Sequence, residues 1–232
     1  MTPQQTLALE IFQFALDMVG IADPTGAADG ISGLISLARG QFWDAAISGA
    51  GLLPYIGDLA KTAKLPKYVK SVAEAIKLAS KDHKFAAVLQ PALAKLKSAL
   101  DTVPLEKLPA DAQRMLRQVK TDIEAFLKRR MYNPNPKHEL AGARGVKGTK
   151  LDLSADQAYE LLNDASRCFD VPGKKQFVAV RNGKIYIFQP DGAGGFHAYP
   201  STGKEIAANF SSVASRVAGQ LGVDFKRLSR ME

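Results

Sequence analysis

Two short runs of alternating apolar residues, joined by Asn182-Gly183, constrain the fold of this chain more than any other feature. An Asn-Gly pair tolerates the positive backbone dihedrals of a two-residue hairpin turn. Alternation with a period of two is typical of a strand that buries one face. We therefore predict that residues 175–181 and 184–189 pair as an antiparallel hairpin, with 196–199 as a third strand after a glycine-rich loop.

Helical signals lie on both sides of this hairpin. Ser154 and Gln157 have the spacing of a capping box, which predicts a helix that begins there and continues to about residue 166. A last helix is expected over 204–221. Helices combined with an antiparallel meander make a compact α+β domain. We predict such a domain, with an antiparallel sheet, over residues 132–232.

The preceding part of the chain has a helical pattern throughout. Its first apolar stripe consists of Leu7, Ile11, Phe14 and Met18. Three later segments each carry an apolar stripe beside lysines, at 68–80, 85–99 and 111–130. Pro91 predicts that the second of these segments begins or bends there.

Asn133-Pro134-Asn135-Pro136 interrupts this pattern, because a residue before proline avoids the helical region. We predict a domain linker at this point. The chain is thus divided into a helical region over 1–60, a basic helical region over 61–131 and the α+β domain over 132–232.

The distribution of charge indicates a polyanionic partner for the later parts of the chain. Residues 1–60 hold one basic side chain against six acidic ones, whereas 61–131 hold sixteen against seven and 132–232 hold fourteen against ten. Nucleic acid and anionic lipid are the usual partners of a basic surface, and charge can also serve solubility alone.

The chain has few residues that could hold a metal or form a disulfide. Cys168 is the single cysteine, so an internal disulfide and a multi-cysteine zinc site are excluded, and we place it at the end of a helix as a core residue. No histidine pair at i, i+4, no Walker loop and no dinucleotide-binding glycine motif occurs. We predict no metal and no small-molecule cofactor.

Histidines are the residues best suited to acid–base chemistry here. His83 is expected on a solvated surface, whereas His138 and His197 fall in the predicted α+β domain beside basic residues and glycines. Two converging histidines can serve as base and acid, although a histidine in a loop is more often structural. RNA provides its own nucleophile, the 2′-hydroxyl, so such a pair needs only a nearby cation. The candidates for that cation are Lys137, Lys150, Lys175, Arg181 and Lys184.

Residues 20–58 resemble a known region of bacterial toxins. Gly20-Ile-Ala-Asp-Pro-Thr-Gly26 is followed, in the expected order, by Pro54-Tyr-Ile-Gly-Asp58. This pattern is similar to the pre-toxin region with a "TG" motif, which precedes the C-terminal toxin domain in polymorphic toxins such as Rhs and contact-dependent inhibition proteins. The resemblance implies a delivered effector and does not specify the activity of its toxin domain.

The last hundred residues resemble toxin domains of the barnase–EndoU–colicin–RelE class of metal-independent ribonucleases. The elements that carry the resemblance are Asn135-Pro-Lys-His138, Leu161-Leu-Asn-Asp164, the hairpin from Asn182 to Pro190, and Gly194-Gly-Phe-His-Ala-Tyr-Pro200. Relatives often have glycine where this chain has Ala198.

This resemblance implies a set of site residues. The catalytic residues would be His138 and His197, with Lys137 and Lys175 at the phosphate and Lys150 as the alternative to Lys175. Substrate binding would involve Lys150, Arg181, Lys184, Tyr186, Tyr199 and Thr202. Tyr186, Phe188 and Tyr199 could stack on bases, or pack in the core as alternating strand residues do.

Together these features predict a secreted antibacterial ribonuclease that acts in the cytoplasm of a target cell. Its expected partners are RNA, including tRNA, and a cognate immunity protein, with transient membrane contact during delivery. No signal peptide is predicted at Met1, and the apolar run 45–56 is too short to span a bilayer. The alternatives are a toxin that permeabilises membranes through its N-terminal helices, and a DNase in the same delivery architecture.

Overall fold

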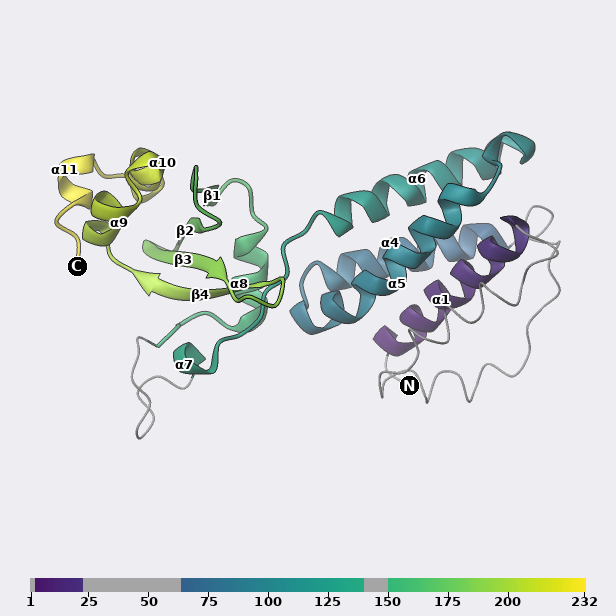
Figure 1. Ribbon diagram of the computed structural model, residues 1–232, viewed down its shortest axis with the longest axis horizontal. Helices are drawn as coiled ribbons and strands as arrows, with labels where there is room; N and C mark the ends of the chain where they lie inside the picture. Colours follow the sequence, from purple (N-terminus) through teal and green to yellow (C-terminus); the bar gives the residue numbers. More distant parts are fainter. Residues whose placement is uncertain (1–2, 23–63, 140–149) are drawn as a thin grey trace. The chain divides into compact units, whose positions relative to one another are not determined.

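The computed structural model describes residues 3–22, 64–139 and 150–232, which fall into two compact units (Figure 1). The helical unit takes its residues from Met1–Ser80 and Lys84–Lys128. The sheet unit takes them from Lys81–His83 and Arg129–Glu232. The predicted fold class, helices followed by a small α+β part with an antiparallel sheet, is confirmed.

The helical unit is built from amphipathic helices that bury their apolar stripes against one another. Its described helices are α1 (Pro3–Ala22), α4 (Lys64–Ala79), α5 (His83–Thr102), the 3₁₀ turn η1 (Leu105–Lys107) and α6 (Ala110–Leu127). α4 packs against both α1 and α6. All four predicted stripe residues of α1 are buried, and Phe14 stacks on Tyr68 of α4 with ring centroids 4.8 Å apart. Helical spacing therefore predicted this core correctly.

Helix α5 begins at His83 and continues through Pro91 without a break. The proline therefore does not start the helix. A proline inside a helix removes one backbone hydrogen bond and costs about 3 kcal/mol. Leu89, Leu93 and Leu96 are completely buried around this point. Their packing offsets that cost, so apolar periodicity prevails over the local preference of proline.

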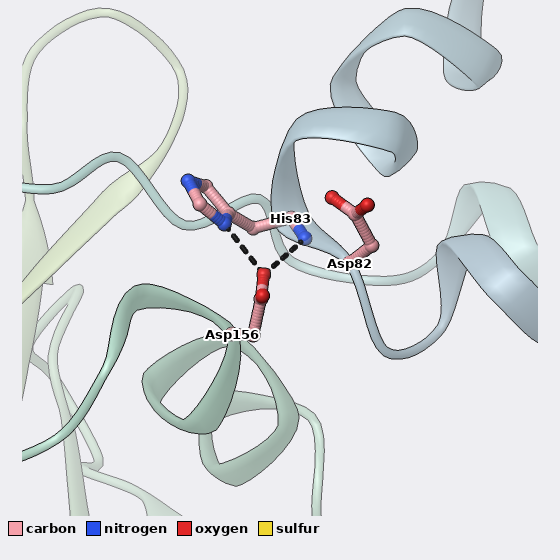
Figure 2. Close-up of side chains that lie close together, drawn as sticks. All are labelled: Asp82, His83 and Asp156. Carbon is pink, nitrogen blue, oxygen red and sulfur yellow. Dashed lines mark hydrogen bonds and ion pairs between the residues drawn. The ribbon is translucent and has the colours of Figure 1, made fainter. Parts of the chain in front are cut away.

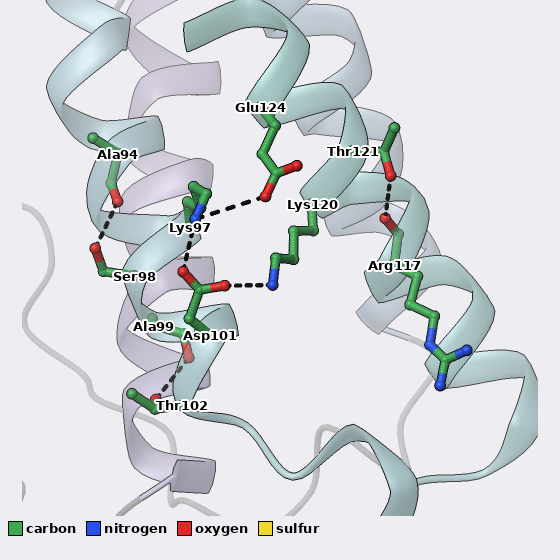
Figure 3. A network of polar contacts seen from close by, with 10 residues as sticks. All are labelled: Ala94, Lys97, Ser98, Ala99, Asp101, Thr102, Arg117, Lys120, Thr121 and Glu124. Carbon is green, nitrogen blue, oxygen red and sulfur yellow. Dashed lines mark hydrogen bonds and ion pairs between the residues drawn. The ribbon is translucent and has the colours of Figure 1, made fainter.

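A polar network lies between the facing sides of α5 and α6 (Figure 3). Lys97 donates to Asp101 at 2.8 Å, and Lys120 Nζ lies 2.5 Å from the other oxygen of the same carboxylate. Lys97 also lies 3.7 Å from Glu124. The hydrogen bond from Lys120, followed by that from Lys97, lowers the pKa of Asp101 despite the opposing effect of burial. Two lysines of the basic region thus have carboxylate partners within their own unit.

The sheet unit contains one antiparallel sheet in the order β1-β2-β3-β4. Its strands are β1 (Cys168–Asp170), β2 (Phe177–Arg181), β3 (Lys184–Pro190) and β4 (Phe196–Ser201). Arg181 pairs with Lys184 across the predicted turn, where Asn182 and Gly183 have φ values of 51° and 76°. These are the positive dihedrals that a type I′ turn requires, so the hairpin prediction is confirmed.

Strand β1 was not predicted, and the placement of Cys168 at the end of a helix is wrong. Helix α8 (Ala155–Leu162) has the predicted capping box of Ser154 and Gln157 but stops at Asn163. The side-chain amide of Asn163 donates to the carbonyl oxygens of Arg130 and Tyr159. These two hydrogen bonds end the helix. Cys168 instead opens β1, where burial raises the pKa of its thiol to about 12.

The two faces of the sheet pack against different elements. Val178, Ile187 and their same-face neighbours contact a cluster formed with α9 (Gly203–Asn209), α10 (Ser211–Leu221) and α11 (Phe225–Leu228). Phe188 points to the opposite face and meets Tyr132 edge to face at 6.2 Å. One helix was predicted over 204–221, but the chain bends at Phe210, whose buried ring contributes to the cluster.

The Asn-Pro stretch predicted as a linker belongs to the sheet unit. Asn133 N donates to Phe196 O at 2.7 Å, and Phe196 N donates to Met131 O at 2.9 Å, so residues 131–133 run along the outer edge of β4. Pro136 then begins the short helix α7 (Pro136–Glu139). The chain passes from the helical unit to the last part of the sheet unit between Lys128 and Arg129. The prolines correctly predicted that the helix ends before this stretch. They could not predict that the stretch pairs with β4, which lies far along the chain.

Two expectations lie outside the described residues. They are the pre-toxin motif beyond Ala22 and the apolar run 45–56. Among the helices that the structure describes, none is long and apolar enough to cross a bilayer.

Candidate functional site

The structure brings His138 and His197 together from two different elements. His138 lies on α7, whose first turn is held by Asn135: Lys137 N donates to its side-chain oxygen at 3.0 Å, and His138 N donates to its carbonyl at 2.9 Å. His197 lies on β4. The two imidazole rings are nearly parallel, with centroids 6.0 Å apart and an interplanar angle of 18°.

Tyr199 completes this cluster of rings. Residues two apart on a strand point to the same face, so Tyr199 follows His197 along β4. His138 stacks on Tyr199 as well, with centroids 5.6 Å apart and an interplanar angle of 25°. A base-stacking role was predicted for Tyr199, whereas in the structure its stacking partner is His138. Tyr199 therefore fixes the position of the histidine ring.

The electrostatic environment favours the neutral form of His197. The residue is 9% exposed, and burial lowers its pKa, as does the adjacent His138. The charge of Asp191 acts in the opposite direction. A histidine that stays neutral below the usual titration range can accept a proton at neutral pH.

Asp191 is a site residue that the sequence reasoning missed. Burial raises its pKa, but the Asn133 amide and the backbone N–H groups of Ala193 and Gly195 donate to it, and together they lower the pKa. The backbone bonds are 2.7 Å and 3.0 Å long. The Asp-Gly sequence after β3 indicated only a turn, and its proximity to His197 depends on the packing of residues 131–133.

A second acidic group lies near Tyr199. Burial and then the charge of Glu205 raise the pKa of the Tyr199 phenol, so it stays protonated. Glu205 accepts a hydrogen bond from Ser201 Oγ at 2.8 Å. Thr202, predicted as a substrate contact, caps α9 by accepting from Glu205 N at 3.1 Å. These residues extend the polar surface from the histidine pair along β4.

Of the predicted cations, Lys137 lies closest in the chain to the histidine pair. It is exposed and precedes His138 on α7. Lys175 lies in the turn before β2, at the end of the sheet that also holds His197, but β3 separates β2 from β4. Strands spaced at about 4.8 Å place the backbones of β2 and β4 roughly 10 Å apart. Adjacency to His138 on α7 therefore favours Lys137 over Lys175 as the cation of this site.

Lys150, Lys184 and Thr202 gather at the other end of the sheet, where they line a cavity of about 360 Å³. A backbone hydrogen bond links the segment that lines this cavity to α7, because Leu151 N donates to His138 O at 3.0 Å. Asp152, another lining residue, pairs with Lys184 Nζ and accepts from Tyr186 OH at 2.8 Å. Three predicted substrate contacts therefore share one site, but this site is not the histidine pair.

The remaining two predicted contacts lie elsewhere. Tyr186 is 2% exposed and faces the side of the sheet opposite His197, so it offers no ring face to a base. Arg181 also points to that side and donates to Gln157 O at 3.2 Å. The burial of Tyr186 agrees with core packing, the alternative to base stacking that the sequence left open, because alternation along a strand does not reveal which face is covered. Phe188 is likewise fully buried.

His83 is not the solvated residue expected from its charged neighbours. It is 9% exposed, and its Nδ1 and backbone N lie 2.7 Å and 2.9 Å from one carboxylate oxygen of Asp156 (Figure 2). Among the described residues, His83, Asp156 and Asp82 offer a donor set for a metal ion, with ligand atoms within 4.8 Å of one another. The observed bonds account for the arrangement without one, because a single oxygen of Asp156 lies within hydrogen-bond distance of both the imidazole and the backbone N–H of His83.

The fold and the geometry define an α+β unit with a histidine pair at an edge strand, and comparison with known proteins adds no family to this description. No family model, curated protein or solved structure matches the chain.

Proposed function

We propose that the sheet unit is a metal-independent endoribonuclease in which His138 and His197 are the catalytic acid and base. The observation that supports this is the parallel approach of the two rings, 6.0 Å apart, from α7 and β4. Acid–base catalysis requires two such groups on either side of one phosphate. RNA suits them because it contains its own nucleophile.

The reaction is an intramolecular transfer. His197 takes the proton of the 2′-hydroxyl, whose oxygen attacks the adjacent phosphorus. The bond from phosphorus to the 5′-oxygen breaks, and protonated His138 gives its proton to that oxygen. The products are a 2′,3′-cyclic phosphate and a free 5′-hydroxyl, and no other reactant is consumed.

The environment of the rings supports this assignment of roles. The base must be neutral at the start, and burial lowers the pKa of His197. The acid must reach the leaving oxygen, and His138 is the less buried of the two rings. The exposed Lys137 beside it provides positive charge for the phosphorane.

The biological setting is part of the same proposal. Its support is the resemblance of residues 20–58 to a pre-toxin region and of the last hundred residues to ribonuclease toxins. In this setting a producing bacterium delivers the chain, which cleaves RNA, with tRNA among its substrates, in the target-cell cytoplasm. A cognate immunity protein with an acidic surface protects the producer, and its binding is fast and salt-sensitive.

The test is RNA cleavage by the full chain in the presence of EDTA. We expect products with cyclic phosphate ends, and we expect His138→Ala and His197→Ala each to lower kcat by about 100-fold or more. The third histidine provides a matched control, because His83→Gln removes an imidazole outside the pair and should retain the rate. Amide NMR spectra establish that each variant is folded. Intact RNA after incubation with folded protein, or full activity of His197→Ala, contradicts the proposal.

A further inference from the structure

The cavity at the hairpin end of the sheet is a site that the histidine chemistry does not use. It has a volume of about 360 Å³ and is lined by the ends of β3 and β4 and by residues 150 and 152. Pockets that bind small organic groups have volumes of about 300–1,000 Å³. The cavity is therefore large enough for one such group.

The charges of the lining argue against a phosphate as its occupant. The lining contains two lysines, Lys150 and Lys184, and two carboxylates, those of Asp152 and Glu232. Asp152 is ionised, because the hydrogen bond from Lys184 lowers its pKa despite opposing burial, and Tyr186 contributes further. A phosphate at this position would meet two negative groups, so the lining does not select for an anion.

The same lining suits a flat heterocycle. Ile185, Pro200 and Met231 contribute apolar surface. Asp152 is held in place by Tyr186 and Lys184, so its carboxylate acceptor lies next to an ammonium donor. The hydrogen-bonding edge of a nucleobase also presents donors and acceptors side by side, and carboxylate and lysine side chains are groups that read them.

The position of the cavity relative to the histidine pair fits a single strand of RNA. His197 and Ser201 lie on the same face of β4, four residues apart along the strand. At about 3.3 Å per residue, this separation is roughly 13 Å. An extended strand of a few nucleotides covers that distance. It would pass the end of β4 to reach both places, because Lys184 and the Tyr186 that Asp152 binds point to the face opposite His197.

We propose that this cavity is a nucleobase subsite, in which Asp152 and Lys184 recognise the base of a nucleotide a few positions from the cleaved bond. This inference rests on the proposed ribonuclease function. It adds that the preference for a particular RNA sequence is determined at this cavity and not at the histidines. Asp152 accepts from the amino or imino group of the base, and Lys184 donates to its ring nitrogen or carbonyl oxygen.

The test is a titration of the full chain with each of the four ribonucleosides and with inorganic phosphate, followed by backbone amide NMR. We expect one nucleoside to shift the amide signals of Gly183, Ile185 and Ser201, and phosphate to leave them unchanged. Asp152→Asn should weaken that binding at least tenfold. Asp111→Asn removes an equal charge from an exposed site on α6 and should leave binding unchanged.

The outcomes separate this inference from the ribonuclease proposal. Shifts caused by phosphate alone, by no ligand, or equally in wild type and Asp152→Asn overturn the subsite, whether or not RNA is cleaved. If the chain binds a nucleoside at the cavity but leaves RNA intact, the subsite is supported and the ribonuclease function is contradicted. Amide signals away from the cavity show whether each variant is folded.

Discussion

The two histidines of the sheet unit differ in burial, and this difference gives them separate chemical roles. His197 is buried on β4 near Asp191, whereas His138 on α7 is only partly buried. Burial disfavours a charged imidazole and a neighbouring imidazolium repels it, while a carboxylate stabilises it. The protonation state of His197 is thus set by burial and by two groups outside β4, His138 and Asp191.

We predict that His197 titrates below the value of about 6.5 that is typical of histidine. His138→Asn should raise this pKa because it removes a repelling charge, and Asp191→Asn should lower it because it removes an attracting one. NMR titration of the ring protons measures both shifts. Because a base with a lowered pKa stays neutral to lower pH, the acidic limb of kcat/KM should also fall below pH 6.5. A pKa at or above the usual value, or shifts of the opposite sign, contradicts this account.

At the scale of the elements, the sequence predicted those that local chemistry determines. The β2–β3 hairpin depends on Asn182-Gly183, and the start of α8 depends on the capping box of Ser154. Strand β1 is only three residues long, too short to show an alternating pattern, although its partner β2 follows closely in the chain, with Asp170 paired to Phe177. No periodic pattern can reveal such a strand.

The candidate site could be predicted only in part for a related reason. His138 and His197 were identifiable by residue type, since imidazole is the group that titrates near neutrality. Their convergence depends on α7 folding against β4, and the role of Asp191 depends on the same packing. For Tyr186 the sequence left base stacking and core packing open, because alternation gives two faces of a strand without saying which one is covered.

The contact between α9 and α11 provides a prediction at this scale. A Cβ built on Gly203 would lie 2.2 Å from Leu228 O and 2.9 Å from Met231 Cβ, so the two elements can approach closely only over a glycine. Gly203→Ala should destabilise the protein by about 2 kcal/mol, as overpacking does. Urea denaturation measures the change in the free energy of unfolding.

Gly219 on α10 is the matched control for this substitution. Nothing lies within 4 Å of a Cβ at that position. Gly219→Ala should therefore stabilise the protein by up to about 1 kcal/mol, through helix propensity alone. Equal effects of the two substitutions would show that α9 and α11 do not approach each other as closely as described.

At the scale of the whole molecule, the sheet unit has its own core. The buried cluster of β1, β2, β3 and the last three helices lies entirely within Arg129–Glu232. We predict that residues 129–232 alone unfold cooperatively, with an m value of about 1 to 2 kcal/mol/M in urea. Dispersed amide NMR signals would accompany that transition. A gradual loss of structure with urea, together with poorly dispersed amide signals, would mean that this core folds only with the rest of the chain.

The net charge of +8 is a property of the whole chain, but its lysines should not contribute equally to RNA binding. Lys120 is paired with Asp101 inside the helical unit, whereas Lys137 is exposed next to His138. Each phosphate contact on a single strand contributes about 0.7 to the slope of log K against log salt. Lys137→Gln should therefore reduce the slope for single-stranded RNA by about 0.7, and Lys120→Gln should leave it unchanged. Fluorescence anisotropy at several salt concentrations measures both slopes, with the catalytically inactive His197→Ala background preventing cleavage. Equal reductions in the two variants would show that RNA responds to total charge rather than to the surface around the histidine pair.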